Sequence, residues 1–145
     1  PLALLVITAV RPLADFIGEV GALQGGVSTT TGFLQIHKSA AEKFHRATLK
    51  GLLYLRDNRA GTVAIHSRVL KVDAATANRL YDLARPGATV DGTVGDDVQR
   101  KSIEQIIERT DVKEAPPARK VFDFSLTRKI YKELQSSGWK PAKGV

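Results

Sequence analysis

The sequence predicts an α/β protein in which helices dominate, and three observations support this. The chain opens with an uncharged run, because residues 2–10 contain no charged side chain. Between Ser39 and Gly138, several segments place apolar residues three and four positions apart, as amphipathic helices require. Capping residues, glycines and prolines separate these segments. We therefore expect short strands near the start of this 145-residue chain and helices after them.

The first expected element is a strand at Ala3–Ile7, because six consecutive apolar residues from Leu2 are typical of a strand buried on both faces. The run is too short to span a bilayer, which takes about 20 apolar residues. It also lacks the basic segment and the cleavage site of a signal peptide. Because residue 1 is proline and the chain has no methionine, we expect a processed chain or a fragment.

The next residues are expected to alternate between short elements and a loop. Leu13–Val20 is a short helical segment that ends at Gly21, and Ala22–Leu23 is a candidate strand. The polar composition of residues 24–32 is typical of a flexible loop. Apolar and polar residues then mix in Phe33–Ile36, which predicts another strand.

The clearest helix is expected over Ser39–Arg56. Ser39 and Glu42 have the spacing of a capping box, in which the two side chains satisfy open amide groups of the first turn. Leu49 and Leu53 widen an apolar stripe on one face. The other members of this stripe recur at helical spacing: Ala41, Phe44, Thr48, Leu52 and Leu55.

Further helices are expected downstream. Gly61–Leu70 is predicted as a shorter second helix, and Asp73 is a good N-cap for a third, which Pro86 and Gly87 stop. A loop follows, and Asp96 opens a fourth helix with acidic residues in its first turn. The buried stripe of this helix is expected to consist of Val98, Ser102, Ile103, Ile106 and Ile107.

The last helix is expected to be well delimited. Val121–Phe122 is a candidate strand before it, and either Asp123 or Ser125 is expected to cap its start. Gly138 is placed for a left-handed C-cap, and Trp139 for the apolar contact that accompanies such a cap.

The basic charge of the chain does not indicate nucleic-acid binding. The net charge is +7 and the pI is about 9.9, values that a nucleic-acid-binding module can have. However, the bases are mixed with acids along the helices, and no run of five or more occurs. We interpret the charge as a solvated basic surface and keep a basic helical nucleic-acid-binding module as an alternative.

Groups suited to catalysis or metal binding are scarce. The chain has no cysteine, and its histidines do not have metal-ligand spacing. The carboxylates near residue 96 lack the donor pattern of a calcium loop and suit helix capping better. We therefore predict no catalytic residue, no metal ligand and no cofactor, and we expect His45 at the surface. The residues considered were His37, His45, His66, Asp91, Asp96 and Asp97.

Polar recognition is the remaining chemistry. A short stretch of the expected loop concentrates four hydroxyl groups, and Arg11 follows the first strand, where open α/β sheets bind ligands. These groups suit a small polar or anionic ligand, with a charge-assisted contact from Arg11. The predicted ligand-binding residues are Thr8, Arg11, Ser28, Thr29, Thr30 and Thr31.

Several separated segments resemble a known family. Ala3–Gly18, Phe44–Leu55, Lys71–Gly92 and Val121–Pro141 are similar, in this order, to parts of the substrate-binding proteins of ABC importers. The similar group includes the binders of nitrate, taurine, alkanesulfonates and thiamine precursors. Members of this group are about twice as long, so the chain resembles their C-terminal half.

The resemblance implies a type II-like periplasmic-binding-protein fold, with two α/β lobes around a ligand cleft. Residues 1–27 would end the second lobe, and residues 28–145 would form the crossover and the helix-rich return to the first lobe. It also implies a non-enzymatic protein outside the cytoplasm, delivering a small polar or anionic solute to permease subunits of the inner membrane. The signal peptide of such a protein is not in this chain.

One alternative within the same fold group is an enzyme similar to the thiamine-pyrimidine synthases. Those enzymes carry a cysteine-rich motif, and a chain without cysteine disfavours this alternative. Half of a two-lobed protein would also leave the apolar faces of Leu4, Val6, Phe33 and Ile36 without their usual neighbours. We therefore expect the chain to associate with itself as a homo-oligomer.

Overall fold

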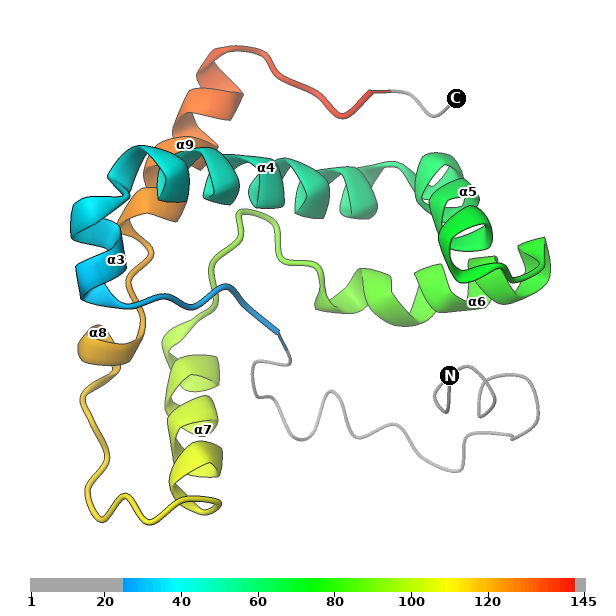
Figure 1. Ribbon diagram of the computed structural model, residues 1–145. Coiled ribbons are helices and arrows are strands. Elements are labelled where there is room, and N and C mark those ends of the chain that lie inside the picture. The colour runs from blue at the N-terminus through cyan, green and yellow to red at the C-terminus, as the bar shows by residue number, and fades with distance from the viewer. Residues whose placement is uncertain (1–24, 143–145) are drawn as a thin grey trace.

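The computed structural model describes residues 25–142, and these residues form helices joined by loops, without strands (Figure 1). The helix-rich expectation is therefore confirmed for this part of the chain. The expected elements at Ala3–Ile7, Leu13–Val20 and Ala22–Leu23 lie outside the described residues. The helices are α3 (Thr31–Ile36), α4 (Lys38–Asp57), α5 (Arg59–Leu70), α6 (Ala74–Ala84), α7 (Asp96–Ile107), α8 (Ala118–Val121) and α9 (Ser125–Ser136), with a 3₁₀ turn η1 (Arg85–Gly87).

Helix α4 organises the arrangement of the other elements. Figure 1 shows α9 crossing the N-terminal half of α4, whereas α5 turns away at the opposite end and α6 runs back below α4. Helices α7 and α8 lie further below and contact each other. None of the helices within residues 25–142 combines the length and the apolar character that crossing a membrane requires.

The apolar core lies between α4 and α9. Leu49 and Leu53 from α4 pack against Ile130 and Leu134 from α9, and Ile130 is completely buried. Full burial of one such side chain is worth about 1.5–3 kcal/mol. These four side chains therefore hold the longest helix to the last one. Partly buried neighbours surround them: Leu52, Leu126, Tyr131 and Trp139.

The loop between η1 and α7 packs onto this core through a glycine. Gly92 has a φ of +79°, and a Cβ atom there would lie 2.8 Å from Cδ1 of Leu49 and 3.0 Å from Cγ2 of Thr127. Both the positive φ and the close approach require glycine. Asp91 orders the same turn, because its Oδ1 accepts hydrogen bonds from the Thr93 amide at 2.9 Å and the Thr93 hydroxyl at 2.8 Å.

The helix expected over Ser39–Arg56 is confirmed as α4, but the expected capping box is wrong. Helix α4 begins at Lys38, directly after His37, so Ser39 lies inside the first turn and no side chain caps it. Glu42 instead pairs with Arg46 at 3.5 Å and with Lys129 of α9 at 3.1 Å. The capping box was predicted wrongly because only one residue, His37, separates α3 from α4, so the helix begins before Ser39.

The apolar stripe of α4 is rotated from the expected one. Leu49 and Leu53 are its buried centre, whereas Phe44 is 60% exposed. His45, expected at the surface, is half-buried and hydrogen-bonded to Thr127 of α9. The position of α9 selects the buried face, and the periodicity of α4 alone does not fix that position.

Two expected strands are also wrong. Phe33–Ile36 belongs to α3, which starts because the Thr30 hydroxyl accepts a hydrogen bond from the Phe33 amide at 3.2 Å. Val121–Phe122 does not form a strand, since Val121 ends α8 and Phe122 is extended without a neighbouring strand among the described residues. Both were short apolar stretches, for which a helix and a strand are difficult to distinguish.

Two of the expected helix ends agree with the structure, and one does not. The Asp73 carboxylate accepts a hydrogen bond from the Thr76 amide at 2.7 Å and caps α6. The expected cap of α9 is wrong, because Phe124 holds its N-cap position without a side-chain hydrogen bond and Ser125 is already its first residue. Asp123 accepts a hydrogen bond from the Ser125 amide at 2.8 Å just before the helix. At the other end of α9, Gly138 has a φ of +65°, and the next amide donates to the carbonyl of Leu134 at 3.0 Å. This is the left-handed C-cap that the sequence predicted.

Candidate functional site

The hydroxyl-rich loop leads directly into helix α3. Ser28 and Thr29 are exposed and make no hydrogen bond within the described residues, whereas Thr30 caps α3 and Thr31 is its first residue. The other two predicted ligand-binding residues, Thr8 and Arg11, lie outside the described residues. Of the four loop hydroxyl groups, that of Thr30 is therefore already used by the backbone.

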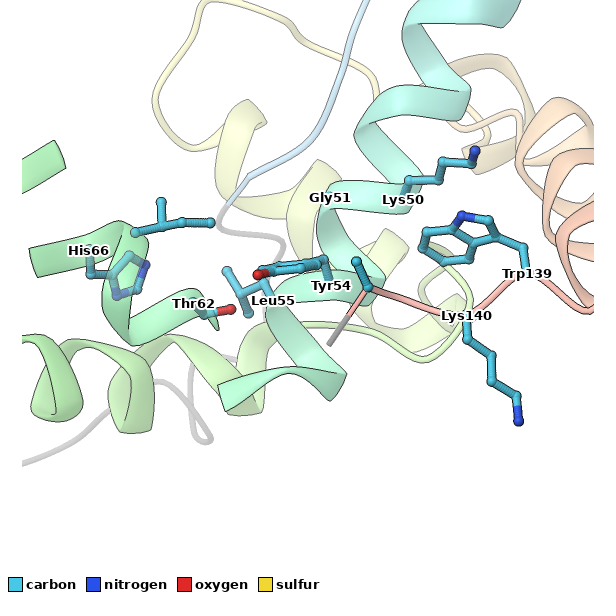
Figure 2. Close-up of a pocket in the computed structure, with 10 residues that line it drawn as sticks. Lys50, Gly51, Tyr54, Leu55, Thr62, His66, Trp139 and Lys140 are labelled. Carbon is cyan, nitrogen blue, oxygen red and sulfur yellow. The ribbon is translucent and has the colours of Figure 1, made fainter. Parts of the chain in front are cut away.

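A pocket of about 610 Å³ lies elsewhere, at the C-terminal end of α4 (Figure 2). Its walls come from α4, from α5 and from the segment that follows α9. The residues that line it are Lys50, Gly51, Tyr54, Leu55, Thr62, Ile65, His66, Trp139, Lys140 and Ala142.

Asn58 joins the three parts of this pocket. Its Oδ1 accepts a hydrogen bond from the Gly61 amide at 2.9 Å and so caps α5. Its Nδ2 donates to the carbonyl of Ala142 at 2.6 Å and fixes the segment after α9 beside the start of α5. One side chain therefore sets both the direction of α5 and the path of the wall that contains Trp139.

Gly61 permits the close approach of α5 to α4. It is buried, and a Cβ atom there would overlap the hydroxyl group of Tyr54. Figure 2 shows the Tyr54 side chain directed from α4 toward α5. The absence of a side chain at residue 61 thus makes room for the Tyr54 ring in the pocket wall.

Two polar atoms on α5 are buried without a partner in the described part of the chain. Thr62 is only 4% exposed, and its Oγ1 makes no hydrogen bond. Nδ1 of His66, one turn further along α5, is also buried without a hydrogen bond. A buried polar atom without a partner costs about 1–3 kcal/mol. Both residues line the pocket, so a polar group within it would find a donor or an acceptor on this wall.

The charged residues of the pocket are all basic. The ammonium group of Lys50 lies 5.3 Å from the centroid of the Trp139 ring, and Lys140 is the next residue along the wall. Figure 2 shows the Lys140 side chain pointing away from the Trp139 ring. Neither lysine forms an ion pair within residues 25–142, and no acidic residue lines the pocket. This charge distribution favours an anion over a cation.

Sequence reasoning had missed this pocket. Trp139 was predicted only as a contact at the end of α9, and His66 was considered only as a histidine without metal-ligand spacing. The sequence signal for the pocket was the spacing of Thr62 and His66, which are one helical turn apart and therefore lie on one face of α5. The pocket also needs the contact between Asn58 and Ala142, which are 84 positions apart, so no local pattern could reveal it.

The described residues do not assemble a metal site. No group of three histidine, aspartate or glutamate residues within 25–142 could hold an ion. Asp96 and Asp97 lie in the first turn of α7, where Asp97 pairs with Arg100 at 3.1 Å, and Asp91 binds Thr93. Asp96 and Asp97 do not cap α7, whose N-cap is Gly95, but lie in its first turn, where the helix dipole favours negative charge, and Asp91 orders a turn.

No family model, curated protein or solved structure matches this chain.

Proposed function

We propose that this chain is a solute-binding component of an ABC importer, in the group that binds nitrate, sulfonates, taurine or thiamine precursors. It belongs to a two-lobed α/β protein, in which residues 1–27 end the second lobe and residues 28–145 form the crossover and the return to the first lobe. The protein works in the periplasm or another extracytoplasmic compartment. There it delivers a small polar or anionic solute to permease subunits of the inner membrane.

The observation that carries this proposal is the order of the resembling segments. Phe44–Leu55 lies within α4, whereas Lys71–Gly92 and Val121–Pro141 contain α6 and α9, respectively. Each of these resembling segments therefore centres on a helix, and the order of the segments is the one that the resemblance implies. The basic surface is compatible with an anionic solute, because positive potential raises the local concentration of anions.

The proposed site for the solute is the hydroxyl-rich loop together with Thr8 and Arg11. The loop supplies Ser28, Thr29 and Thr31, whose hydroxyl groups donate and accept hydrogen bonds. Thr30 is assigned to the start of α3, since its hydroxyl already accepts from the Phe33 amide. Arg11 supplies the one positive charge of this set, and it suits the planar oxygens of nitrate or the tetrahedral oxygens of a sulfonate.

Calorimetric titration of the 145-residue chain with nitrate, taurine, ethanesulfonate and a hydroxymethylpyrimidine tests the proposal. We expect one of these solutes to bind and Arg11→Ala to weaken its affinity about 10- to 150-fold, the equivalent of losing a charge-assisted hydrogen bond of about 1.5–3 kcal/mol. The double variant Ser28→Ala/Thr29→Ala should also weaken binding.

Thr30→Ser is the matched control for this experiment. It keeps the hydroxyl that caps α3, so helix formation should be preserved and affinity should change little. No binding of any of the four solutes, or equal affinity in Arg11→Ala and the double variant, would refute the assignment.

A further inference from the structure

The segment of residues 139–142, which we call the strap, forms one wall of the pocket at the end of α4. Lys140 and Ala142 both line the pocket and are exposed. Pro141 lies between them, and its ring fixes its own φ and disfavours a helical conformation of Lys140. Figure 2 shows the strap on one side of the Tyr54 ring and the labelled residues of α5 on the other. The strap is therefore a short, stiff segment that closes one side of the pocket.

The two ends of the strap are held unequally. At the first end, Trp139 packs against the core between α4 and α9, and its amide donates to the carbonyl of Leu134 at 3.0 Å. The ammonium group of Lys50 lies 5.3 Å from the centroid of the same ring. At the second end, Nδ2 of Asn58 donates to the carbonyl of Ala142 at 2.6 Å, and no other hydrogen bond or ion pair within the described part of the chain fixes this end. Breaking one hydrogen bond would therefore free the second end while the first stays anchored.

The side chain that holds the strap is itself fixed by another contact. Oδ1 of Asn58 accepts a hydrogen bond from the Gly61 amide at 2.9 Å and caps α5. Such a cap does not need the strap, because the helix supplies its own amide donor. The amide group of Asn58 therefore stays in position when the strap leaves, and the strap can return to the same donor.

We propose that the strap is a gate of the pocket: it swings about Trp139 when the hydrogen bond between Asn58 and Ala142 breaks, and it closes when this bond forms again. The open strap connects the pocket to solvent and sets the access of small molecules to it. The gate does not depend on the proposed solute site. Residues 28–31 precede α3 at the opposite end of α4 (Figure 1).

Nuclear magnetic resonance relaxation of the ¹⁵N-labelled 145-residue chain tests the gate at each amide. Asn58→Asp keeps an oxygen that caps α5 and removes the amide donor to the strap. We expect the order parameter of the Ala142 amide to fall from about 0.85 to below about 0.6, whereas the Trp139 amide keeps its value. Asn58→Ser should have the same effect, because serine is also a good N-cap and its hydroxyl is too short to serve both contacts.

Trp139 reports whether the pocket opens, because it is the only tryptophan of the chain and lines the pocket. Acrylamide, a neutral quencher of tryptophan fluorescence, is the probe. Its quenching constant should rise at least about 1.5-fold in both Asn58 variants, since a locally opened strap no longer shields the pocket side of the ring.

The matched control is Asp73→Asn, which exchanges the same two side chains in the opposite direction. Asp73 caps α6 by accepting from the Thr76 amide at 2.7 Å and makes no hydrogen bond to the strap. Order at Ala142 and quenching of Trp139 should therefore stay unchanged in this variant.

Four outcomes would overturn the gate. The first is an Ala142 amide that is already disordered in the unsubstituted chain, and the second is one that stays ordered in both Asn58 variants. The third is loss of order at Trp139 together with Ala142, because the anchored end would then not be a hinge. The fourth is quenching that does not change in the Asn58 variants or that rises equally in Asp73→Asn.

Discussion

At the residue scale, glycines show how the surroundings of a position decide its role. Gly51 and Gly61 both lie inside helices, but the space around their Cα atoms differs. A Cβ atom at Gly51 would meet open space, whereas one at Gly61 would overlap the Tyr54 hydroxyl and approach Nδ2 of Asn58 to 2.9 Å. Gly61 is thus required by packing, and no steric reason for Gly51 exists among the described residues.

Substitution of these two glycines by alanine should therefore change stability in opposite directions. Gly51→Ala should raise the free energy of unfolding by about 0.5–1 kcal/mol, because glycine inside a helix has an entropic cost that alanine lacks. Gly61→Ala should lower the free energy of unfolding, because the added methyl group displaces the Tyr54 ring. Urea titrations followed by circular dichroism measure both. A destabilised Gly51→Ala variant would contradict the open environment described for that residue.

At the element scale, the contact between α4 and α9 combines an apolar centre with a polar edge. Leu49, Leu53, Ile130 and Leu134 form the centre. Arg46 pairs with Glu133 at the edge, and Nε2 of His45 lies 2.8 Å from Oγ1 of Thr127. Burial against α9 lowers the pKa of His45 below its ordinary value of 6.5. Packing of α4 against α9 therefore makes His45 bind a proton less readily.

The lowered pKa of His45 predicts how stability depends on pH. The unfolded chain binds the proton more readily than the folded one, so the contribution of this group is fully present above about pH 6.5 and is lost as the pH falls through the folded pKa. His45→Gln keeps a side chain that can bond Thr127 but cannot titrate, and should flatten this part of the profile. Unfolding free energies measured at a series of pH values test this. His37→Gln, an exposed control, should keep the slope, and an unchanged slope in His45→Gln would contradict the assignment.

Some features of these helices could be predicted from the sequence, and others could not. Asp73 and Gly138 were identified correctly because each cap is formed with residues at most five positions away. Ser39 was misassigned as a cap because α3 continues almost directly into α4, which a single pattern does not show. The buried face of α4 and the pocket beside it were missed for another reason, since both depend on α9 and the segment after it.

At the scale of the whole molecule, the described residues leave many apolar side chains in contact with solvent. Ile36 is 78% exposed and Phe44 is 60% exposed, on the adjoining helices α3 and α4. Phe33, which was also expected on an apolar face without neighbours, is 45% exposed. Large exposed apolar patches mark surfaces that associate.

We therefore expect the chain to form dimers or larger homo-oligomers through the surface that contains Ile36 and Phe44. Sedimentation velocity over a range of micromolar concentrations should give a mass above the monomer value of 15.7 kDa. The variant Ile36→Ser/Phe44→Ser should shift the distribution toward monomer, because each substitution removes exposed apolar area without disturbing the core between α4 and α9. Val112→Ser, which replaces an exposed apolar side chain in the loop before α8, should leave the distribution unchanged. A monomer at all concentrations, with a single cooperative thermal transition, would show that these side chains are exposed without associating.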